Sequence, residues 1–342
     1  MVKKVRFGVV GLGNIGSLHV DNIQRSMDEA EVIALAETRK DVLRQISDRY
    51  GIERRYKDYS QLAKDEDVDA VIIALPSFMH CEAVKIFAES YKHVFCEKPM
   101  ALTLEEADDV ISMVDKHGIK LQVGYNRRFD EAYMKAKELI EKGDLGAITL
   151  ARSNTRDPVP PSGWEKDPKL SGGTFIGTCT HDFDILRWLI GSESEEVYAS
   201  QAFFVYEDLK KLGYPDNVMV MIRFRSGTMA EVDASRNCAY GYDVRTEVFG
   251  TKGAVRIEKE KELDLLVFDE GGVRHDYPYW FAKRFPEAYL REVKAFTKCI
   301  FEDTKPSVTA EDARAVLEMA IAAAKSAQSG KTVRLPLDYG HD

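Results

Sequence analysis

A short apolar segment followed at once by closely spaced glycines is the feature that most constrains this chain. Val5–Val10 is apolar and rich in β-branched residues, and Gly11, Gly13 and Gly16 follow directly, opening an apolar pattern with helical spacing. In a dinucleotide-binding unit the first glycine permits a tight turn, the second lets the backbone approach a pyrophosphate, and the third lets helix and strand pack closely. Taken alone, the pattern also fits an ordinary glycine-rich turn.

A carboxylate at the end of the next predicted strand supports the nucleotide interpretation. The apolar segment 32–36 ends at Glu37, about 20 residues beyond Gly16, where a carboxylate accepts hydrogen bonds from the adenosine ribose. Glu37 would repel a 2′-phosphate, which favours NAD over NADP. Arg39 keeps NADP open as an alternative, because an arginine can hold that phosphate, although it also fits a solvated helix start.

Apolar runs and amphipathic helical patterns alternate through residues 1–124. Continuous apolar runs such as 70–75 indicate parallel strands covered on both faces. A helix is predicted to begin with a capping box at Thr103 and Glu106. The sequence therefore predicts an N-terminal Rossmann domain, a doubly wound parallel sheet. His80, at a helix start, either lines the cofactor site or is a surface or capping residue.

The remaining residues, 125–342, are predicted to form a C-terminal α/β domain. Prolines gather between 158 and 168 and exclude regular structure there, which indicates a surface loop or a lid. The pattern predicts helices at 130–142, 281–302 and 309–329, a further helix carrying Leu186 to Ile190, and strands at 147–154, 196–206, 217–225, 228–235, 244–249, 253–258 and 263–268.

Composition excludes several classes of protein. A chain of 342 residues exceeds what one core usually supports, which agrees with two domains. The net charge of −9 argues against nucleic acid or an anionic membrane as partner. No apolar run approaches the roughly 18 residues of a membrane span. The five cysteines are odd in number without a C-x-x-C, and the histidines lack ligand spacing, so we expect no disulfide framework, no metal and a cytoplasmic location.

Several motifs together resemble those of the Gfo/Idh/MocA oxidoreductases. They are Gly11-x-Gly13-x-x-Gly16, Pro76-Ser77-x-x-His80, Glu97-Lys98-Pro99, Gly124-Tyr125-Asn126-Arg127-Arg128-Phe129-Asp130, and Gly172-Gly173 followed by His181-Asp182-Phe183-Asp184. Within the family the chain is most similar to the inositol 2-dehydrogenases, to which it is linked by Arg156-Asp157-Pro158 and Tyr240-Gly241-Tyr242-Asp243. The resemblance covers nearly the whole chain. It implies a C-terminal domain with an open, mostly antiparallel sheet, a homo-oligomer (dimer or tetramer) formed through that sheet, and a cis Lys98–Pro99 peptide.

The resemblance implies an NAD-dependent oxidation of a secondary alcohol of a cyclitol or sugar to a ketone. In such a reaction Lys98 hydrogen-bonds the reacting hydroxyl and the nicotinamide, and His181 accepts the proton. Histidine suits this role because its ordinary pKa is about 6.5, whereas Lys98 needs burial or the nicotinium charge to lower its pKa. The structural alternatives are a surface lysine in a turn and a histidine that stacks on the sheet from a helix N-terminus.

The remaining site residues are assigned on the same basis. Arg127 and Arg128 alternatively form interdomain salt bridges, and Tyr240 is alternatively a core tyrosine. The residues expected to bind substrate hydroxyls are Arg127, Arg156, Asp157, Asp184 and Tyr240. Those expected to contact the cofactor are Gly11, Gly13, Asn14, Ile15, Glu37, Thr38, Arg39, Leu75, Pro76, His80, Glu97 and Lys98.

Gly177 departs from the pattern of the inositol dehydrogenases. That group has an aspartate four residues before the catalytic histidine, where it orients and polarises the imidazole, and here the position is Gly177. Loss of such an orienting group weakens a catalytic histidine, unless Asp182 or Asp184 compensates. Alternatively, the missing carboxylate enlarges the pocket for a bulkier cyclitol.

Three functions therefore compete. The first is an NAD-dependent cyclitol or sugar dehydrogenase. The second is a dinucleotide-binding sensor that does not turn its ligand over, and the third is an enzyme that cleaves glycosides or epimerises sugars through transient oxidation. Cofactor retained through purification favours the third, and free cofactor exchange without turnover favours the second.

Overall fold

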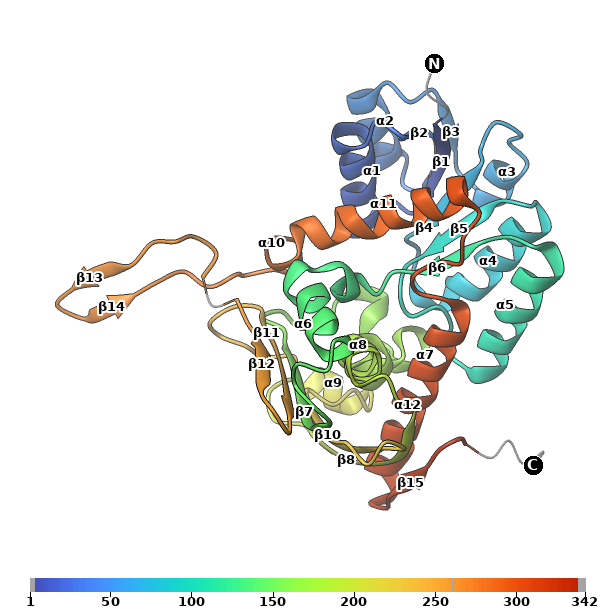
Figure 1. The fold of residues 1–342 in the computed structure, drawn as a ribbon. Coiled ribbons are helices and arrows are strands. Elements are labelled where there is room, and N and C mark those ends of the chain that lie inside the picture. The colour runs from blue at the N-terminus through green and yellow to red at the C-terminus, as the bar shows by residue number, and fades with distance from the viewer. Residues whose placement is uncertain (1–3, 260, 338–342) are drawn as a thin grey trace. The chain divides into compact units, whose positions relative to one another are not determined.

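The computed structural model describes residues 4–259 and 261–337, and the chain divides into two compact units (Figure 1). The first unit comprises Met1–Asn126 and Glu287–Ala315, and the second comprises Arg127–Pro286 and Val316–Asp342. The return of a late segment to the first unit is not visible in the sequence pattern. The assignment of residues 1–124 to cofactor binding and 125–342 to substrate binding remains a prediction.

The first unit is built on a six-stranded sheet with the order β3-β2-β1-β4-β5-β6, and all its pairings are parallel. This is the doubly wound order in which the chain reverses between β1 and β4, and it confirms the predicted fold. The elements are β1 Val5–Val10, α1 Asn14–Ser26, β2 Ala30–Ala36, α2 Lys40–Tyr50, β3 Arg54–Tyr56, α3 Tyr59–Ala63, β4 Ala70–Ile73, η1 Ser77–Met79, α4 His80–Glu89, β5 His93–Cys96, α5 Leu104–His117, β6 Leu121–Val123 and α11 Pro286–Glu302.

Helix α11 closes one face of this sheet, beside α1 (Figure 1). The ring of Phe296 lies 6.3 Å from that of Phe7 and 6.0 Å from that of Phe95, centroid to centroid, and Val293 joins the same core. Continuous burial of β4, β5 and β6 follows from cover on both faces. The expected capping box at the start of α5 is confirmed, because Thr103 and Glu106 satisfy each other's backbone N–H groups.

The second unit is built on a seven-stranded mixed sheet with the order β12-β11-β7-β10-β9-β8-β15, in which only the β7–β10 pair is parallel among the described pairings. The mostly antiparallel sheet is as predicted. The elements are η2 Asn126–Phe129, α6 Glu131–Glu141, β7 Ile148–Arg156, η3 Gly163–Lys166, α7 Pro168–Ser171, η4 Thr174–Thr178, α8 Thr180–Ile190, β8 Ser194–Ala202, α9 Glu207–Lys211, β9 Asn217–Phe224, β10 Met229–Ser235, β11 Asp243–Gly250, β12 Ala254–Ile257, β13 Val267–Asp269, β14 Gly272–Arg274, α10 Phe281–Arg284, α12 Ala310–Ser329 and β15 Val333–Arg334.

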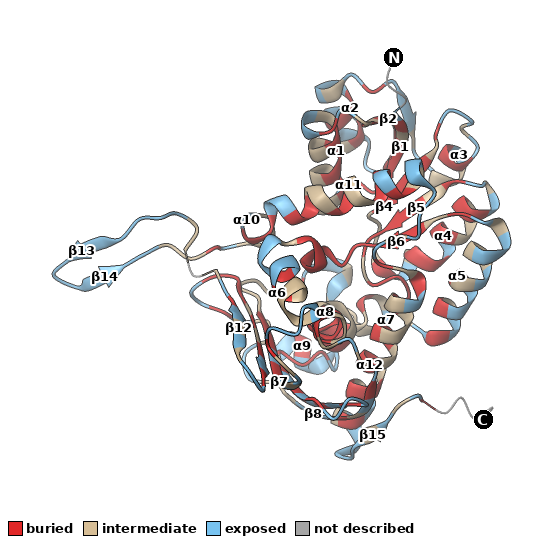
Figure 2. Cartoon of the chain, viewed as in Figure 1, coloured by how far each residue is buried: buried red, intermediate tan, exposed pale blue. Residues whose placement is uncertain are grey.

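The strands of this sheet alternate between a buried and an exposed face (Figure 2). In β9 the side chains of Val218, Val220 and Ile222 are buried, whereas Met219 and Met221 are exposed. Helices α8 and α12 contribute to the buried side: α8 contacts β7 and β10, and Ser326 of α12 accepts a hydrogen bond from a β8 amide. The helix α8 is therefore fixed against the sheet at its first turns, where the candidate site lies.

Several local expectations differ from the structure. Of the expected strand at 263–268, only residues 267–268 form a strand, as part of β13, which pairs with β14 in a short exposed hairpin. The expected helix 281–302 is divided into α10 and α11 at Pro286, because proline lacks the N–H that would continue a helix.

The proline-rich segment holds two single-turn helices, η3 and α7, rather than an entirely irregular loop. The expected cis peptide between Lys98 and Pro99 is present. Among the described residues, no helix combines the length and the apolar character that a membrane crossing requires.

Candidate active site

The three glycines of the glycine turn differ in whether the backbone leaves room for a side chain. A Cβ on Gly11, whose φ is +83°, would lie 2.4 Å from the Ala74 carbonyl oxygen, and one on Gly16 would lie 1.8 Å from the Gly11 carbonyl oxygen. A Cβ on Gly13 would meet nothing within 4 Å. The backbone itself therefore explains Gly11 and Gly16, whereas Gly13 leaves open space at the N-terminus of α1. That space suits a pyrophosphate, whose charge the helix N-terminus stabilises.

Glu37 is fixed at the end of β2 by four donor groups. Its carboxylate accepts hydrogen bonds from the Leu12 amide at 2.9 Å, from the Arg39 amide and guanidinium, and from the Thr38 hydroxyl. Burial opposes ionisation, but the hydrogen bonds from Arg39 and the backbone outweigh it and lower the pKa of Glu37 to about 2. The carboxylate is thus ionised and tied to the glycine turn. Arg39 is engaged by Glu37, which disfavours its use for a 2′-phosphate.

His80 is buried and lies between two backbone segments. Its Nδ1 is 2.7 Å from the Pro99 carbonyl oxygen and its Nε2 is 2.8 Å from the Leu75 carbonyl oxygen. Desolvation lowers the pKa of His80 despite both contacts. Its imidazole therefore joins the segment after β4, where Leu75 and Pro76 lie, to the segment that carries Lys98. Its predicted contact with the cofactor is better described as support for the backbone on either side.

Lys98 follows a buried carboxylate. Glu97 is 8% exposed and accepts a hydrogen bond from His19 Nε2 at 2.8 Å. Its other oxygen lies against Gly124, where a Cβ would approach to 3.0 Å. Lys98 itself is only partly buried, whereas the preceding residue is buried and held by His19.

The first turn of α8 is anchored by a buried polar network. Asp182 is fully buried and accepts hydrogen bonds from Arg127 at 2.7 Å, Ser153 at 2.6 Å and Thr155 at 2.8 Å. Arg127 also donates to Thr155 at 2.6 Å, and its guanidinium lies 5.9 Å from the Phe285 ring centroid. The adjacent His181 is partly exposed. Because Asp182 fixes this turn to strand β7, the position of His181 is fixed as well.

A second arginine, Arg128, holds the same helix at Asp184, two residues after Asp182. Arg128 donates to both carboxylate oxygens of Asp184, at 2.9 Å and 2.5 Å, and its guanidinium lies 5.9 Å from the Trp188 ring centroid. Both arginine–aspartate pairs lie within the second unit. The alternative of interdomain salt bridges is therefore wrong for these pairs. Arg127 and Asp184, predicted to bind substrate, are 1% and 0% exposed and have protein partners, which favours a supporting role.

Gly177 lies in a single π-helical turn, η4, just before α8. The backbone φ of Gly177 is not in the left-handed region, and a Cβ there would lie 3.2 Å from the Ser171 carbonyl oxygen. A side chain at this position therefore requires the Ser171 carbonyl to move by a few tenths of an ångström. Asp182 and Asp184 are held by arginines, so the structure offers no support for their replacing the missing carboxylate.

The other predicted substrate residues gather near the ends of β7 and β10. Arg156 pairs with Asp233 at 2.8 Å. Tyr240 is 54% exposed and donates to buried Asp243 at 2.6 Å, and burial together with that bond raises the pKa of Tyr240 to about 12. Tyr240 is thus not a core tyrosine. Asp157 pairs with Arg236.

Four residues near this group were not predicted as site residues from the sequence: Asp243, Tyr277, Arg245 and Arg236. Asp243 is a shared acceptor for Tyr240, for Tyr277 at 3.0 Å and for Arg245 at 2.7 Å. Arg236 joins Asp157 to Thr178, the neighbour of Gly177, at 3.2 Å. The Tyr240-Gly241-Tyr242-Asp243 motif was the available signal for Asp243, whereas nothing local marked Arg236.

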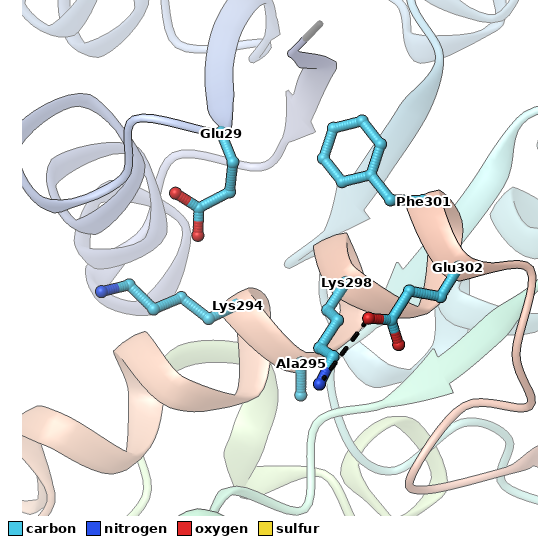
Figure 3. A pocket seen from close by; sticks show the side chains of 6 residues that line it. All are labelled: Glu29, Lys294, Ala295, Lys298, Phe301 and Glu302. Atoms are coloured by element: carbon cyan, nitrogen blue, oxygen red, sulfur yellow. Dashed lines mark ion pairs between the residues drawn. The ribbon is translucent and has the colours of Figure 1, made fainter. Parts of the chain in front are cut away.

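A surface hollow of about 460 Å³ lies in the first unit beside α11 (Figure 3). None of the predicted site residues lines it. Its rim carries charges of both signs, including the Lys298–Glu302 pair at 3.8 Å. We assign it no role in the chemistry, because it lacks convergent polar groups. Its lining is Glu29, Lys294, Ala295, Lys298, Phe301 and Glu302.

Comparison with protein families identifies both parts of the chain. Residues 5–125 match the NAD-binding Rossmann fold of the GFO_IDH_MocA oxidoreductase family, and residues 137–335 match its C-terminal alpha/beta domain. The chain belongs to this family. The resemblance drawn from the motifs is confirmed, and with it the NAD-binding character of the Rossmann domain.

Relatives with names cover almost the whole chain. The chain is 39% identical to a myo-inositol 2-dehydrogenase of Thermotoga maritima over 97% of its own length and 98% of the relative. It is 35% identical to a scyllo-inositol 2-dehydrogenase (NAD(+)) of Bacillus subtilis over 98% and 97%. The crystal structure of scyllo-inositol dehydrogenase from Lactobacillus casei with bound NAD(H) and scyllo-inositol matches with a TM-score of 0.91 at 32% identity, covering 97% and 99% of the two chains.

Proposed function

We propose that this protein is an NAD-dependent dehydrogenase that oxidises a secondary alcohol of a cyclitol, with myo- or scyllo-inositol or a related inositol as substrate. The observation that carries the proposal is a repeated arrangement. Lys98 follows the buried Glu97 and His181 precedes the buried Asp182, and each reactive side chain is more accessible than its fixed neighbour. The named inositol dehydrogenases among the relatives supply the substrate class.

The proposed roles follow from the chemistry of an alcohol oxidation. NAD, when bound, accepts the hydride. Lys98 donates a hydrogen bond to the reacting hydroxyl and stabilises the developing alkoxide, and His181 accepts the hydroxyl proton. Gly13 leaves room for the pyrophosphate, and Glu37 accepts from the ribose hydroxyls. His80 supports the backbone on both sides of the nicotinamide end.

Recognition of the polyol is assigned to accessible polar groups. Arg156 and Tyr240 are partly exposed, and the Arg236 ion pair fixes Asp157. Together they offer donors and acceptors on a rigid strand end, which is what a polyol requires. We propose that Arg127 and Asp184 do not contact the substrate but hold α8 in place.

The test is the reduction of NAD by myo-, scyllo- and chiro-inositol with purified protein. Lys98→Met and His181→Gln should each lower kcat by about 10²- to 10⁴-fold, while binding of NADH, followed by its fluorescence, is kept. Lys116→Met and His275→Gln are matched controls, because both side chains are exposed and lie outside the site. Turnover of no cyclitol refutes the substrate class, and unchanged kcat in both site variants refutes the roles.

Gly177→Asp decides the meaning of the glycine. If Gly177 enlarges the pocket, wild type turns over a cyclitol and the aspartate variant is slower. If the glycine has weakened the histidine, the aspartate variant is faster on the same substrate. A silent wild type and an active Gly177→Asp variant would favour the sensor, which the named relatives do not favour.

We propose that the protein is a homo-oligomer, a dimer or a tetramer, assembled through the exposed face of the seven-stranded sheet. Apolar side chains recur on that face across neighbouring strands: Leu150 lies beside Phe249 and Met229, and Met221 lies beside Tyr198. Single exposed apolar residues are ordinary, but a contiguous group favours an interface. Light scattering of the purified protein measures the mass directly.

A cytoplasmic location is also proposed. All five cysteines are buried and free, which suits a reducing compartment.

A further inference from the structure

A buried acid with no assigned role lies behind the Glu97–Lys98 dipeptide. Glu292, on α11, is 0% exposed, and so is His19 on α1. One side-chain nitrogen or oxygen of each of Glu292, His19 and Glu97 lies within 4.8 Å of the others. All three belong to the first unit. Neither carboxyl oxygen of Glu292 has a hydrogen-bond partner among the described residues.

The cluster holds two carboxyl groups and one imidazole. His19 Nε2 lies 2.8 Å from the Glu97 carboxylate and donates to it, and its Nδ1 has no hydrogen-bond partner among the described residues. Phe95 and Tyr289 contact the His19 ring edge-on at 5.3 Å and 6.2 Å, and buried Gln122 donates to the backbone carbonyl of Glu292 at 2.8 Å. Two ionised carboxylates would repel each other here without water to screen them.

We propose that Glu292 carries a proton in the folded protein and acts as a positioning residue for Glu97, so that a single negative charge stays beside His19. Burial, and next the charge of Glu97, raise the pKa of Glu292 well above its ordinary range, which agrees with this assignment. The hydrogen bond from His19 Nε2 to Glu97 at 2.8 Å already satisfies one nitrogen of the ring without a metal ion.

The consequence for the site concerns the backbone. Glu97 follows directly on β5, and Lys98 follows Glu97, so a displacement of the Glu97 side chain moves the peptide that carries the lysine. A neutral Glu292 keeps Glu97 between His19 and Gly124. This second part of the inference rests on the proposed function, whereas the location of the proton does not.

The first experiment compares the thermal midpoints of wild type and Glu292→Gln from about pH 5 to about pH 9. When folding raises the pKa of a carboxyl group, the folded protein is most stable below the pKa that the group has in the unfolded chain. The free energy of unfolding then falls as pH rises from that value toward the pKa in the folded protein. The amide cannot ionise, so the stability of Glu292→Gln relative to wild type should increase as pH rises. The slope of that increase should correspond to the release of about one proton. Glu287→Gln is the control, since Glu287 is exposed on the same helix.

Parallel curves for wild type and Glu292→Gln would overturn the proton assignment, because a purely structural effect shifts the curve by a constant amount. Elemental analysis of the purified protein is run alongside. A stoichiometric metal whose removal by a chelator lowers the midpoint would overturn the assignment in favour of a metal site.

The second experiment tests positioning by rescue. Glu292→Leu, which replaces the polar carboxyl group beside Glu97 with an apolar side chain, should lower kcat about tenfold or more, with little change in KM for NAD, and Glu292→Gln should restore most of the loss. Equal kcat in the two variants would overturn the positioning role. A wild type that oxidises no cyclitol refutes the proposed function alone, because the pH experiment still locates the proton.

Discussion

The two units bury charge in opposite ways. In the second unit each buried aspartate of α8 faces an arginine: Asp182 is held by Arg127 and Asp184 by Arg128. In the first unit Glu97 and Glu292 lie close to one histidine, which is hydrogen-bonded to Glu97 and not to Glu292. Matched pairs stay ionised and fix an element in place, whereas an unmatched pair has to keep a proton to remain buried. One unit therefore positions its histidine with fixed charge, and the other positions its lysine beside a group that titrates.

The largest expected effect comes from breaking a matched pair. Arg127→Met leaves Asp182 buried without its charged partner, so the free energy of unfolding should fall by about 3–5 kcal/mol. The double variant Arg127→Met/Asp182→Leu should recover much of that loss, because no uncompensated charge remains. Denaturant unfolding followed by tryptophan fluorescence measures both.

The matched control for that experiment lies on the exposed face of the same sheet. Arg223 pairs with Glu196 at 3.0 Å, with both side chains partly exposed. Arg223→Gln should cost less than about 1 kcal/mol. If Arg127→Met costs no more than Arg223→Gln, the buried pair does not anchor α8 and the comparison fails.

Much of the first unit was predictable because its signals are local. Gly11, Gly13 and Gly16 follow their strand directly, and Glu37 ends the next one. The capping box of α5 is likewise written in four consecutive positions. Local patterns fail where the pairing is distant or weak. Strand β3 is a three-residue edge strand, Arg54–Tyr56, with no apolar pattern of its own.

The site was predictable in its motifs but not in its partners. Lys98 and His181 are predicted by resemblance, yet the partners that hold their neighbours come from distant elements. Glu292 was missed because a glutamate in an amphipathic helix is ordinarily solvated. A signal did exist: Glu292 lies three residues after Tyr289 and four before Phe296, on the apolar face of α11. Arg236 had no such signal, since only the folded sheet brings it to Asp157 and Thr178.

An intermediate effect is expected where a carboxylate sets cofactor preference. Glu37→Ser removes the acceptor for the ribose and releases Arg39 from its pair. The ratio of kcat/KM for NAD to that for NADP should fall by about 10- to 100-fold, since one charged hydrogen bond is lost and one repulsion removed. Glu53→Ser, an exposed position before β3, is the control. An unchanged ratio would show that Glu37 does not contact the ribose.

The smallest expected effect is the pH dependence of stability that Glu37 causes, which is opposite in direction to that of Glu292. Hydrogen bonds from Arg39 and the backbone outweigh burial and lower the pKa of Glu37 to about 2 in the folded protein, below its unfolded value. The stability that Glu37 contributes is therefore present above about pH 4.5 and lost as pH falls from there toward pH 2, opposite in direction to Glu292. Because the Arg39 side chain is 55% exposed, the contribution is discounted to about 1–2 kcal/mol.

Thermal midpoints of wild type and Glu37→Gln, compared from about pH 6 down to about pH 3, measure this contribution. The wild type should have the higher thermal midpoint at about pH 6, and the difference from Glu37→Gln should disappear as pH falls. The difference between wild type and Glu292→Gln should instead grow as pH rises. If the Glu37→Gln difference stays constant across that range, the carboxylate is not selectively stabilised in the folded state. Glu37, whose carboxylate accepts several hydrogen bonds, and Glu292, whose carboxyl group accepts none among the described residues, would then not respond to pH in opposite directions.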